Sequence, residues 1–405
     1  MFFNGANINQ LANIKFGFEK ALFLRINFYG MIQKLILLIF GIAIAISVQA
    51  QEVQKRTYHF VELKPHFGQP IIYSDSLTST LNKSFFAGDV RWGVQTNGER
   101  NQDQFLAFPT YGIGLYHAYL SSPDTLGRPW ALYFFYSAPI FRTERFTFGY
   151  EAALGVAWNF AKFDPETNSK NDLIGSAVNA YFNGGLFLKY KLTNRFDIGA
   201  AVDFTHFSNG AMQTPNKGMN LRGGNVSLAY HFTPRVKKGI LAGRAELKPK
   251  DLGGIEKYNE ININAAIGGK ATTKEYGSGP KYFASSLIVD FNRRYSWIGK
   301  FGAGLDWIYD SSLSEDYEGE ENTPHSKYMF LGLHLGHELI ISKVSVVTQA
   351  GTYLIKGTPA KGWFFFRLQL KYSFTPNWSA SIALKTANGF KADFIEFGIG
   401  HRFQL

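Results

Sequence analysis

His206 and Ser208 are the two residues of this sequence whose types and spacing point most directly to chemistry. They stand near the end of segment 195–208, whose alternating apolar and polar residues predict a β-strand. Side chains two residues apart on a strand share a face, so these two lie as close as one strand allows. This is the spacing that a base needs to reach a nucleophilic hydroxyl.

The face that carries this pair is otherwise apolar. Its remaining members are Phe196, Ile198, Ala200, Val202 and Phe204. The opposite face carries Asp197, Gly199, Ala201, Asp203 and Thr205. A polar pair at the end of an apolar stripe indicates chemistry on a lipid-facing surface.

A polar loop, 209–221, leads from this strand to a second predicted strand, 222–232. The apolar face of the second strand is formed by Val226, Leu228, Tyr230 and Phe232. Asn220 has the parity of that face. Without an intervening bulge, the Asn220 side chain is expected to face outward beside the His206 and Ser208 pair.

These residues carry a family resemblance. The run His206-Phe-Ser-Asn209, followed by Pro215-Asn-x-Gly218-x-Asn220, resembles the active-site signature of outer-membrane lipid A 3-O-deacylases of the PagL type, which are related to acyloxyacyl hydrolases. The resemblance implies a β-barrel esterase that removes an ester-linked acyl chain from lipid A of lipopolysaccharide. It implies a carboxylic ester hydrolase that needs no cofactor and no metal.

The resemblance also implies a role for each residue of the motif. His206 is the base and Ser208 the nucleophile. Asn216 falls at the asparagine that binds the oxyanion, together with Asn209 and a backbone N–H near Gly210. Asn220 falls where many members carry the glutamate that orients the histidine, so this chain departs from the family there.

The first fifty residues read as a leader rather than as part of the fold. Met31 to Lys34 form a charged start, Leu35 to Ile46 an apolar core, and Val48-Gln-Ala50 a cleavage site. Residues 31–50 therefore predict a signal peptide, with Gln51 as the first mature residue. Residues 1–30 are interpreted as an over-extended start. The alternative is a transmembrane anchor, although the apolar run is short for a span.

Composition and alternation predict an all-β fold. The chain of 405 residues holds 38 Phe, 21 Tyr and 41 Gly but no Cys. After Ala50 no apolar run is long enough for a transmembrane helix, yet strand-like segments recur. Secreted chains of this kind form antiparallel transmembrane β-barrels, because closure leaves no unpaired edge in lipid. The expected location is the cell outer membrane, which the chain crosses many times.

About sixteen strand-like segments are expected, within a range of 12–16. They are 56–66, 84–95, 109–120, 129–138, 144–160, 178–192, 195–208, 222–232, 259–270, 281–292, 296–309, 326–341, 343–355, 362–374, 377–387 and 393–403.

The lengths of the turns predict the orientation of the strands. With a periplasmic N-terminus, the short turns Thr193-Asn194 and Thr375-Pro376 fall on the periplasmic side. Loop 209–221 then falls outside, which places His206 and Ser208 at the outer leaflet, where lipopolysaccharide is the expected partner.

Segment 233–258 is long and basic for a periplasmic turn. It divides the chain into a barrel half 51–233 with the catalytic motif, a basic connection 234–258, and a barrel half 259–405 without catalytic residues. The halves echo each other, since Ser208-Asn-Gly210 is matched by Ala387-Asn-Gly389. One barrel of about sixteen strands and two tandem eight-stranded units both remain open.

Other partners follow from charge and from the last strand. The net charge of +11 suits a phosphorylated glycolipid, or is an ordinary solubilising imbalance. The alternating residues from Ile395 to Phe403 resemble the signal read by the outer-membrane assembly machinery. Nucleic acid is not expected, because no basic helix or known module is present.

An acidic loop allows two interpretations. It could bind divalent cations that bridge lipopolysaccharide phosphates, or it is a solvated loop. Its residues are Glu315, Asp316, Glu318, Glu320 and Glu321.

Two alternative functions stay open at this point. One is a non-catalytic barrel that acts as a pore, a lipid transporter or a structural protein and carries a decayed motif. The other is an outer-membrane phospholipase.

Overall fold

The computed structural model describes residues 58–71, 83–98, 100–232, 252, 254–272, 281–317, 324–357, 361–389 and 391–405. The expected leader segments 1–30 and 31–50 lie outside the described residues, as does most of the basic connection 234–258.

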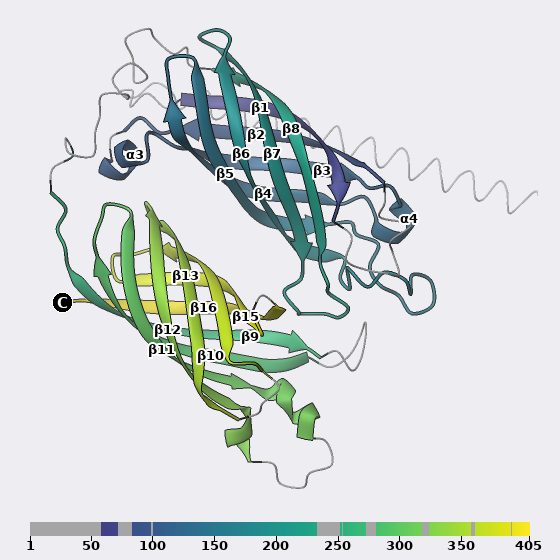
Figure 1. Ribbon diagram of the computed structural model, residues 1–405, viewed down its shortest axis with the longest axis vertical. Coiled ribbons are helices and arrows are strands. Elements are labelled where there is room, and N and C mark those ends of the chain that lie inside the picture. The colour runs from purple at the N-terminus through teal and green to yellow at the C-terminus, as the bar shows by residue number, and fades with distance from the viewer. Residues whose placement is uncertain are drawn as a thin grey trace, which may run out of the picture. The chain divides into compact units, whose positions relative to one another are not determined.

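Two closed antiparallel barrels make up the described fold (Figure 1). In the first barrel, each of the strands β1–β8 pairs with its sequence neighbour, and β1 pairs with β8. Its strands are β1 (Tyr58–Pro70), β2 (Phe85–Gln95), β3 (Thr110–Tyr119), β4 (Trp130–Arg142), β5 (Phe146–Trp158), β6 (Val178–Lys191), β7 (Phe196–Ser208) and β8 (Met219–His231).

The second barrel repeats this topology with strands β9–β16, and β16 closes onto β9. Its strands are β9 (Asn259–Ala271), β10 (Lys281–Arg294), β11 (Gly299–Asp310), β12 (Met329–Ile341), β13 (Val344–Lys356), β14 (Phe364–Ser373), β15 (Trp378–Ala387) and β16 (Lys391–Gln404). Of the two architectures that the sequence left open, the tandem one is confirmed.

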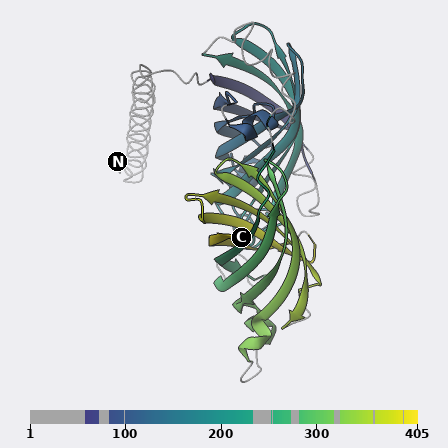
Figure 2. The same cartoon turned by 90° about the vertical axis from the view of Figure 1, so that its left-hand side faces the viewer.

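Closure explains why these strands can sit in lipid. Every strand is hydrogen-bonded on both sides, so neither barrel exposes an unpaired edge. Figure 2 shows the strands of each barrel running obliquely, which is the tilt that closing a sheet requires.

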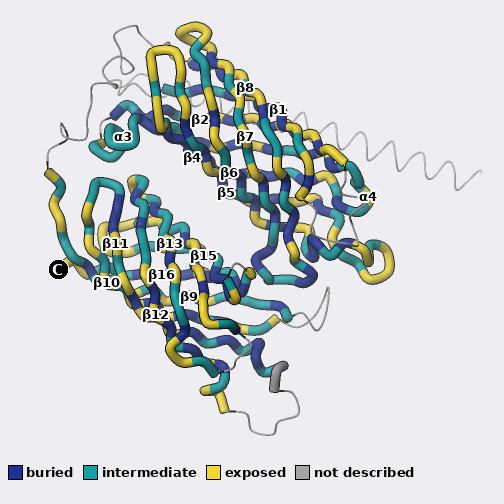
Figure 3. The backbone as a smooth tube through the Cα atoms, viewed as in Figure 1, coloured by how far each residue is buried: buried dark blue, intermediate teal, exposed yellow. Residues whose placement is uncertain are grey.

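Residues alternate between buried and exposed along the strands (Figure 3). On β7 the outward Val202 is 65% exposed, whereas the inward Phe207 is fully buried. Large apolar side chains occupy most of the outward positions, as expected for a surface that faces hydrocarbon.

The barrel interiors are filled by charged and aromatic side chains. In the first barrel, the buried Arg91 donates to both carboxylate oxygens of Glu151, at 2.5 and 2.7 Å, and to the Tyr133 hydroxyl at 2.8 Å. In the second, the buried Arg367 donates to Glu396 at 2.6 Å. Buried charges persist only when paired in this way, so each network holds its strands in register.

The connections at the two ends of each barrel differ in length. Short turns join β6 to β7 at 192–195 and β14 to β15 at 374–377, as expected. Several connections at the opposite end are longer, including 159–177 and 209–218, whereas 388–390 there is short. The connection 96–109 at the short-turn end is also long and contains a short helix. Short turns lie on the periplasmic side in barrels of this kind, which predicts that the 209–218 loop faces outward from the cell.

Short helices occupy some of the remaining connections. They are α3 (Asn101–Phe105), α4 (Pro123–Leu126), and the 3-10 helices η3 (Ser311–Tyr317) and η4 (His325–Tyr328).

Within the described ranges, no helix has the length and apolar character needed to cross a membrane.

Candidate active site

His206 and Ser208 lie at the outer end of β7, on the face that points away from the barrel interior. Both are half-buried, and the outward Phe204 precedes them on the same face. Asp203 points inward instead, where its carboxylate contacts His66 at 3.1 Å and accepts a hydrogen bond from Asn225 at 2.5 Å. The predicted outward orientation of the pair agrees with this alternation.

A continuous hydrogen-bonded line joins three of the predicted residues. His206 Nε2 lies 2.9 Å from Ser208 Oγ, and His206 Nδ1 lies 2.5 Å from Asn220 Oδ1. The strand register directly opposes His206 and Asn220 across β7 and β8. Because the Asn220 oxygen can only accept, Nδ1 donates to it, and Nε2 is left as the acceptor of the Ser208 hydroxyl proton.

This tautomer is the one that base catalysis requires. A neutral imidazole with a free Nε2 lone pair can take the proton from a serine as the oxygen attacks. The geometry therefore brings together a hydroxyl, an imidazole and an amide on one lipid-facing surface, as the predicted nucleophile, base and orienting group require.

Gly218 makes room for the histidine ring. Its φ is +76°, and a Cβ built there would lie 2.8 Å from Cε1 of His206 and 3.1 Å from the carbonyl oxygen of Phe207. Only glycine satisfies both the left-handed backbone and this close approach at low cost. The glycine of the Pro-Asn-x-Gly motif thus packs against the His206 ring.

Asn216 and Asn209 play different parts in the loop. Asn216 Oδ1 accepts the backbone N–H of Asn209 at 3.1 Å, and its two N–H donors have no partner among the residues that the structure describes. The Asn209 side chain is buried, donates to Ser176 Oγ at 3.0 Å and accepts from the Gln213 N–H at 3.3 Å. In this arrangement the Asn209 amide and its backbone N–H hold the loop.

Gly210 follows Ser208 closely and has a φ of +62°. This left-handed turn lets the chain reverse direction directly beyond the serine.

A neighbouring outer loop supports the motif, and sequence reasoning missed it. Asn171 is fully buried; it donates to the carbonyls of Ala161 at 2.7 Å and Thr125 at 2.9 Å, and it accepts two backbone N–H groups. The next residue but one, Leu173, accepts the Gly218 N–H at 3.0 Å. The polar, turn-forming composition of 164–172 was the available signal, but it could not indicate which loop it supports.

Among the described residues of the second barrel, no such arrangement stands at the matching strand end. Ala387 stands where the echoed motif places Ser208, and Lys385 precedes it by two residues. Lys385 is fully buried in the interior, donating to Asp393 at 3.0 Å and to the Tyr353 hydroxyl.

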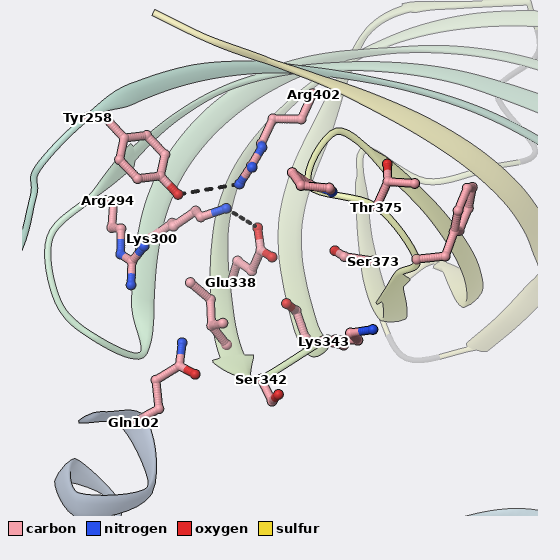
Figure 4. Close-up of a pocket in the computed structure, with 14 residues that line it drawn as sticks. Gln102, Tyr258, Arg294, Lys300, Glu338, Ser342, Lys343, Ser373, Thr375 and Arg402 are labelled. Atoms are coloured by element: carbon pink, nitrogen blue, oxygen red, sulfur yellow. Dashed lines mark hydrogen bonds and ion pairs between the residues drawn. The ribbon is translucent and has the colours of Figure 1, made fainter. Parts of the chain in front are cut away.

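A polar pocket lies at the short-turn end of the second barrel (Figure 4). Lys300 reaches into it and pairs with Glu260 at 2.8 Å and Glu338 at 3.5 Å, while Arg402 contacts the Tyr258 hydroxyl at 3.4 Å. The charged side chains named above are thus paired with one another. No histidine is among the described residues that line the pocket, so none of its hydroxyl groups has an imidazole beside it as Ser208 does.

Across the described residues, no group of three or more His, Asp or Glu side chains is arranged to hold a metal ion. The predicted acidic loop lies largely beyond those residues, since Glu318, Glu320 and Glu321 are not described.

Two family models match this chain, one for each barrel. Residues 87–229 match the model described as lipid A 3-O-deacylase (PagL), and this range contains His206, Ser208 and Asn220. Residues 259–405 match the model described as the acyloxyacyl hydrolase C-terminal domain. A search of curated proteins found no relative of this chain.

The solved structures that resemble the chain include three outer-membrane proteins. The crystal structure of the outer membrane enzyme PagL is 17% identical over 42% of this chain and 98% of that chain, with a TM-score of 0.29. Omp33 of Acinetobacter baumannii is 9% identical over 87% of this chain and 100% of its own, with a TM-score of 0.16. An outer-membrane channel from Pseudomonas putida F1 is 11% identical over 88% and 98%, with a TM-score of 0.17.

Proposed function

The chain belongs to the lipid A 3-O-deacylase (PagL) family and resides in the outer membrane, and we propose that it is a serine esterase that removes an ester-linked acyl chain from lipid A of lipopolysaccharide. The observation that carries this proposal is the hydrogen-bonded line from Asn220 through His206 to Ser208 on the lipid-facing surface.

The proposed reaction uses side chains alone. His206 Nε2 takes the hydroxyl proton as Ser208 Oγ attacks the ester carbonyl carbon of the glycolipid. The carbonyl becomes a tetrahedral oxyanion. As this intermediate collapses, the sugar oxygen leaves with the proton from the imidazolium, and the acyl chain stays on Ser208. Water, deprotonated by His206, then releases the fatty acid and restores the serine.

The developing oxyanion needs hydrogen-bond donors. The free N–H donors of Asn216 and the backbone N–H of Gly210 are the groups of the loop suited to this role. Removal of one such donor typically costs a few kcal/mol of transition-state stabilisation. Asn209 serves this site indirectly, because its backbone N–H fixes the Asn216 amide.

Asn220 is the departure from the carboxylate of many relatives. Its oxygen holds His206 in the tautomer that accepts a proton. It brings no negative charge, however, and therefore stabilises the imidazolium less than a carboxylate does. We infer a slower enzyme than one with glutamate at this position.

The location of the site suits a substrate that stays in the membrane. Lipopolysaccharide occupies the outer leaflet, and the site lies at the outer end of β7 on the lipid-facing surface. An acylated glycolipid can reach Ser208 by lateral diffusion. A soluble ester has no comparable route past the surrounding apolar side chains.

The two halves have different proposed tasks. Residues 51–233, after removal of leader 31–50, form the catalytic barrel; 234–258 connect it to the non-catalytic barrel of 259–405. The C-terminal strand β16, with Phe403 near its end, is the proposed contact for the assembly machinery.

The test is release of fatty acid by the purified full-length protein. Lipopolysaccharide and phospholipid are incubated separately with the wild type and with Ser208→Ala. Ser285→Ala is the matched control, because Ser285 is a half-buried outward serine near the outer end of β10. We expect the wild type and Ser285→Ala to release fatty acid from lipopolysaccharide, and Ser208→Ala to release none.

Each rival has its own outcome in this assay. Serine-dependent release from phospholipid alone identifies a phospholipase. No release from either substrate favours a non-catalytic barrel. Among such barrels a pore is the least supported, because aromatic and charged side chains fill both described interiors.

A further inference from the structure

Arg222 is a cation on the lipid-facing surface beside the candidate active site. It lies on β8 two residues beyond Asn220, and its side chain is exposed. Its partner in the register is Phe204 on β7 and, on β1, Gln69. Further along the same face of β8, the exposed residues are the apolar Val226 and Leu228.

An unpaired charge on this surface attracts a counter-charge. An arginine facing hydrocarbon is destabilising at mid-depth and is tolerated near the interface, where anionic head groups lie. Arg222 makes no ion pair and no side-chain hydrogen bond with any residue that the structure describes. By contrast, Arg195 at the other end of this hairpin donates to the Phe232 carbonyl at 2.8 Å.

The nearest cation of the loop is already neutralised. Lys217 pairs with Asp172 at 2.6 Å, which ties the 209–218 loop to the 159–177 loop. Arg222 is therefore the cation next to the triad whose charge the described protein leaves uncompensated.

The strand geometry places Arg222 beside the site. Because β8 begins at the outer end, Asn220 lies nearer to the membrane surface than Arg222 does. Their Cα atoms are separated by about 7 Å along the strand, from a rise of about 3.4 Å per residue. A long cationic side chain extends toward the polar surface of the bilayer, which here means toward Asn220 and His206.

We infer that Arg222 binds a phosphate group on the head of the acylated glycolipid, an inference that rests on the proposed esterase function. The guanidinium can donate two parallel hydrogen bonds to phosphate oxygens, a geometry that favours arginine wherever phosphate is recognised. Bound in this way, the head group is held with its acyl ester at Ser208. Arg222 thus determines specificity for phosphorylated substrates.

The experiment compares three substrates in the same detergent: phosphorylated lipid A, the same lipid A after chemical dephosphorylation, and phosphatidylglycerol. Arg222→Gln should lower kcat/KM for phosphorylated lipid A by about tenfold or more, mainly through KM, since it removes charge-assisted hydrogen bonds to the phosphate. Its kcat/KM for dephosphorylated lipid A should fall less than twofold. Arg222→Lys keeps the charge but lacks the planar guanidinium. Its kcat/KM for phosphorylated lipid A should lie between those of the wild type and Arg222→Gln.

Lys281→Gln is the matched control. Lys281 is likewise an exposed, outward cation at the outer end of its strand, β10, but in the barrel without the triad. It should leave all three rates unchanged. Equal losses of Arg222→Gln on phosphorylated and dephosphorylated lipid A would overturn the inference, as would no loss on either. A selective loss on phosphatidylglycerol alone would assign the site to phospholipid and overturn it too.

A binding measurement separates this inference from the proposed chemistry. Ser208→Ala and the double variant Ser208→Ala/Arg222→Gln are titrated with phosphorylated and dephosphorylated lipid A. If Arg222 binds phosphate, the double variant should bind phosphorylated lipid A about tenfold more weakly than Ser208→Ala does, and the two variants should bind dephosphorylated lipid A equally. This result does not depend on whether the wild type releases fatty acid. Equal affinities of the two variants for it would refute the site, whatever the esterase assay shows.

Discussion

The two barrels share a plan and differ at the outer end of one strand. The seventh strand of the first barrel, β7, has 13 residues and ends with His206 and Ser208 facing outward. Its counterpart β15 has 10 residues, and a register shift follows Lys385, whose side chain points inward. Because faces alternate with every residue, a shorter strand with a bulge presents different side chains to lipid.

The interiors of the two barrels, in contrast, are similar. Each holds a buried histidine between two aspartates: His66 lies 3.1 Å from Asp203, and His334 lies 2.6 Å from Asp290. Each second nitrogen also faces an aspartate, so neither ring is free to serve a hydroxyl. Buried His–Asp contacts are therefore shared structural features, and the outward histidine bonded to a serine distinguishes the first barrel.

The largest expected effect comes from removing the nucleophile or the base. Ser208→Ala and His206→Ala should each lower fatty-acid release by at least about a thousandfold, as losses of such residues do in serine hydrolases. The control is His117→Ala, because His117 is also half-buried near the outer end of a strand but stacks on Trp130. Folding of each variant is checked by its heat-modifiable mobility on gels. A folded Ser208→Ala or His206→Ala variant that keeps the wild-type rate would place catalysis elsewhere.

Gly218→Ala should have the next largest effect. The new Cβ would approach the His206 ring to 2.8 Å, so the imidazole or the loop must shift. A displacement of about 1 Å at a reacting group can cost about a hundredfold in rate. The loss should appear in kcat. Gly389→Ala in the second barrel is the matched control. Gly389 also has a positive φ, +86°, but a Cβ added there would have no atom within 4 Å. If both variants lose activity alike, contact with His206 is not the cause.

Asn220 should matter less than Ser208. Asn220→Ala removes the acceptor that orients His206, and we expect a loss of about tenfold, smaller than the 10²–10⁴ range typical of a whole general base. Asn220→Glu should preserve or raise turnover, since a carboxylate also stabilises the imidazolium. Unchanged activity in Asn220→Ala together with lost activity in Asn220→Glu would show that another residue orients the histidine.

Adding a serine to the second barrel should have no effect on activity, and this tests the difference between the two barrels directly. Ser208→Ala/Ala387→Ser should release no more fatty acid than Ser208→Ala. Position 387 lacks a histidine two residues before it, and Lys385 there is bonded inside the barrel. Recovery of activity in the double variant would mean that the second barrel holds a base of its own.

The sequence by itself determined the strands and the faces of their residues. Segment 195–208 was expected where the strand is Phe196–Ser208, and 259–270 where it is Asn259–Ala271. Alternation with a period of two is a local property, readable from neighbouring residues. For the same reason, the closeness of His206 to Ser208 and the outward parity of Asn220 were predictable without a structure.

Only the tertiary structure decided how the strands close and what the loops do. One large barrel and two small ones have the same local pattern; the pairing of β1 with β8 and of β9 with β16 distinguishes them. The roles of Asn171 and Gly218 likewise depend on one loop packing against another. Such contacts join residues far apart in the chain, and their free energy depends on register and closure, which no stretch of sequence encodes alone.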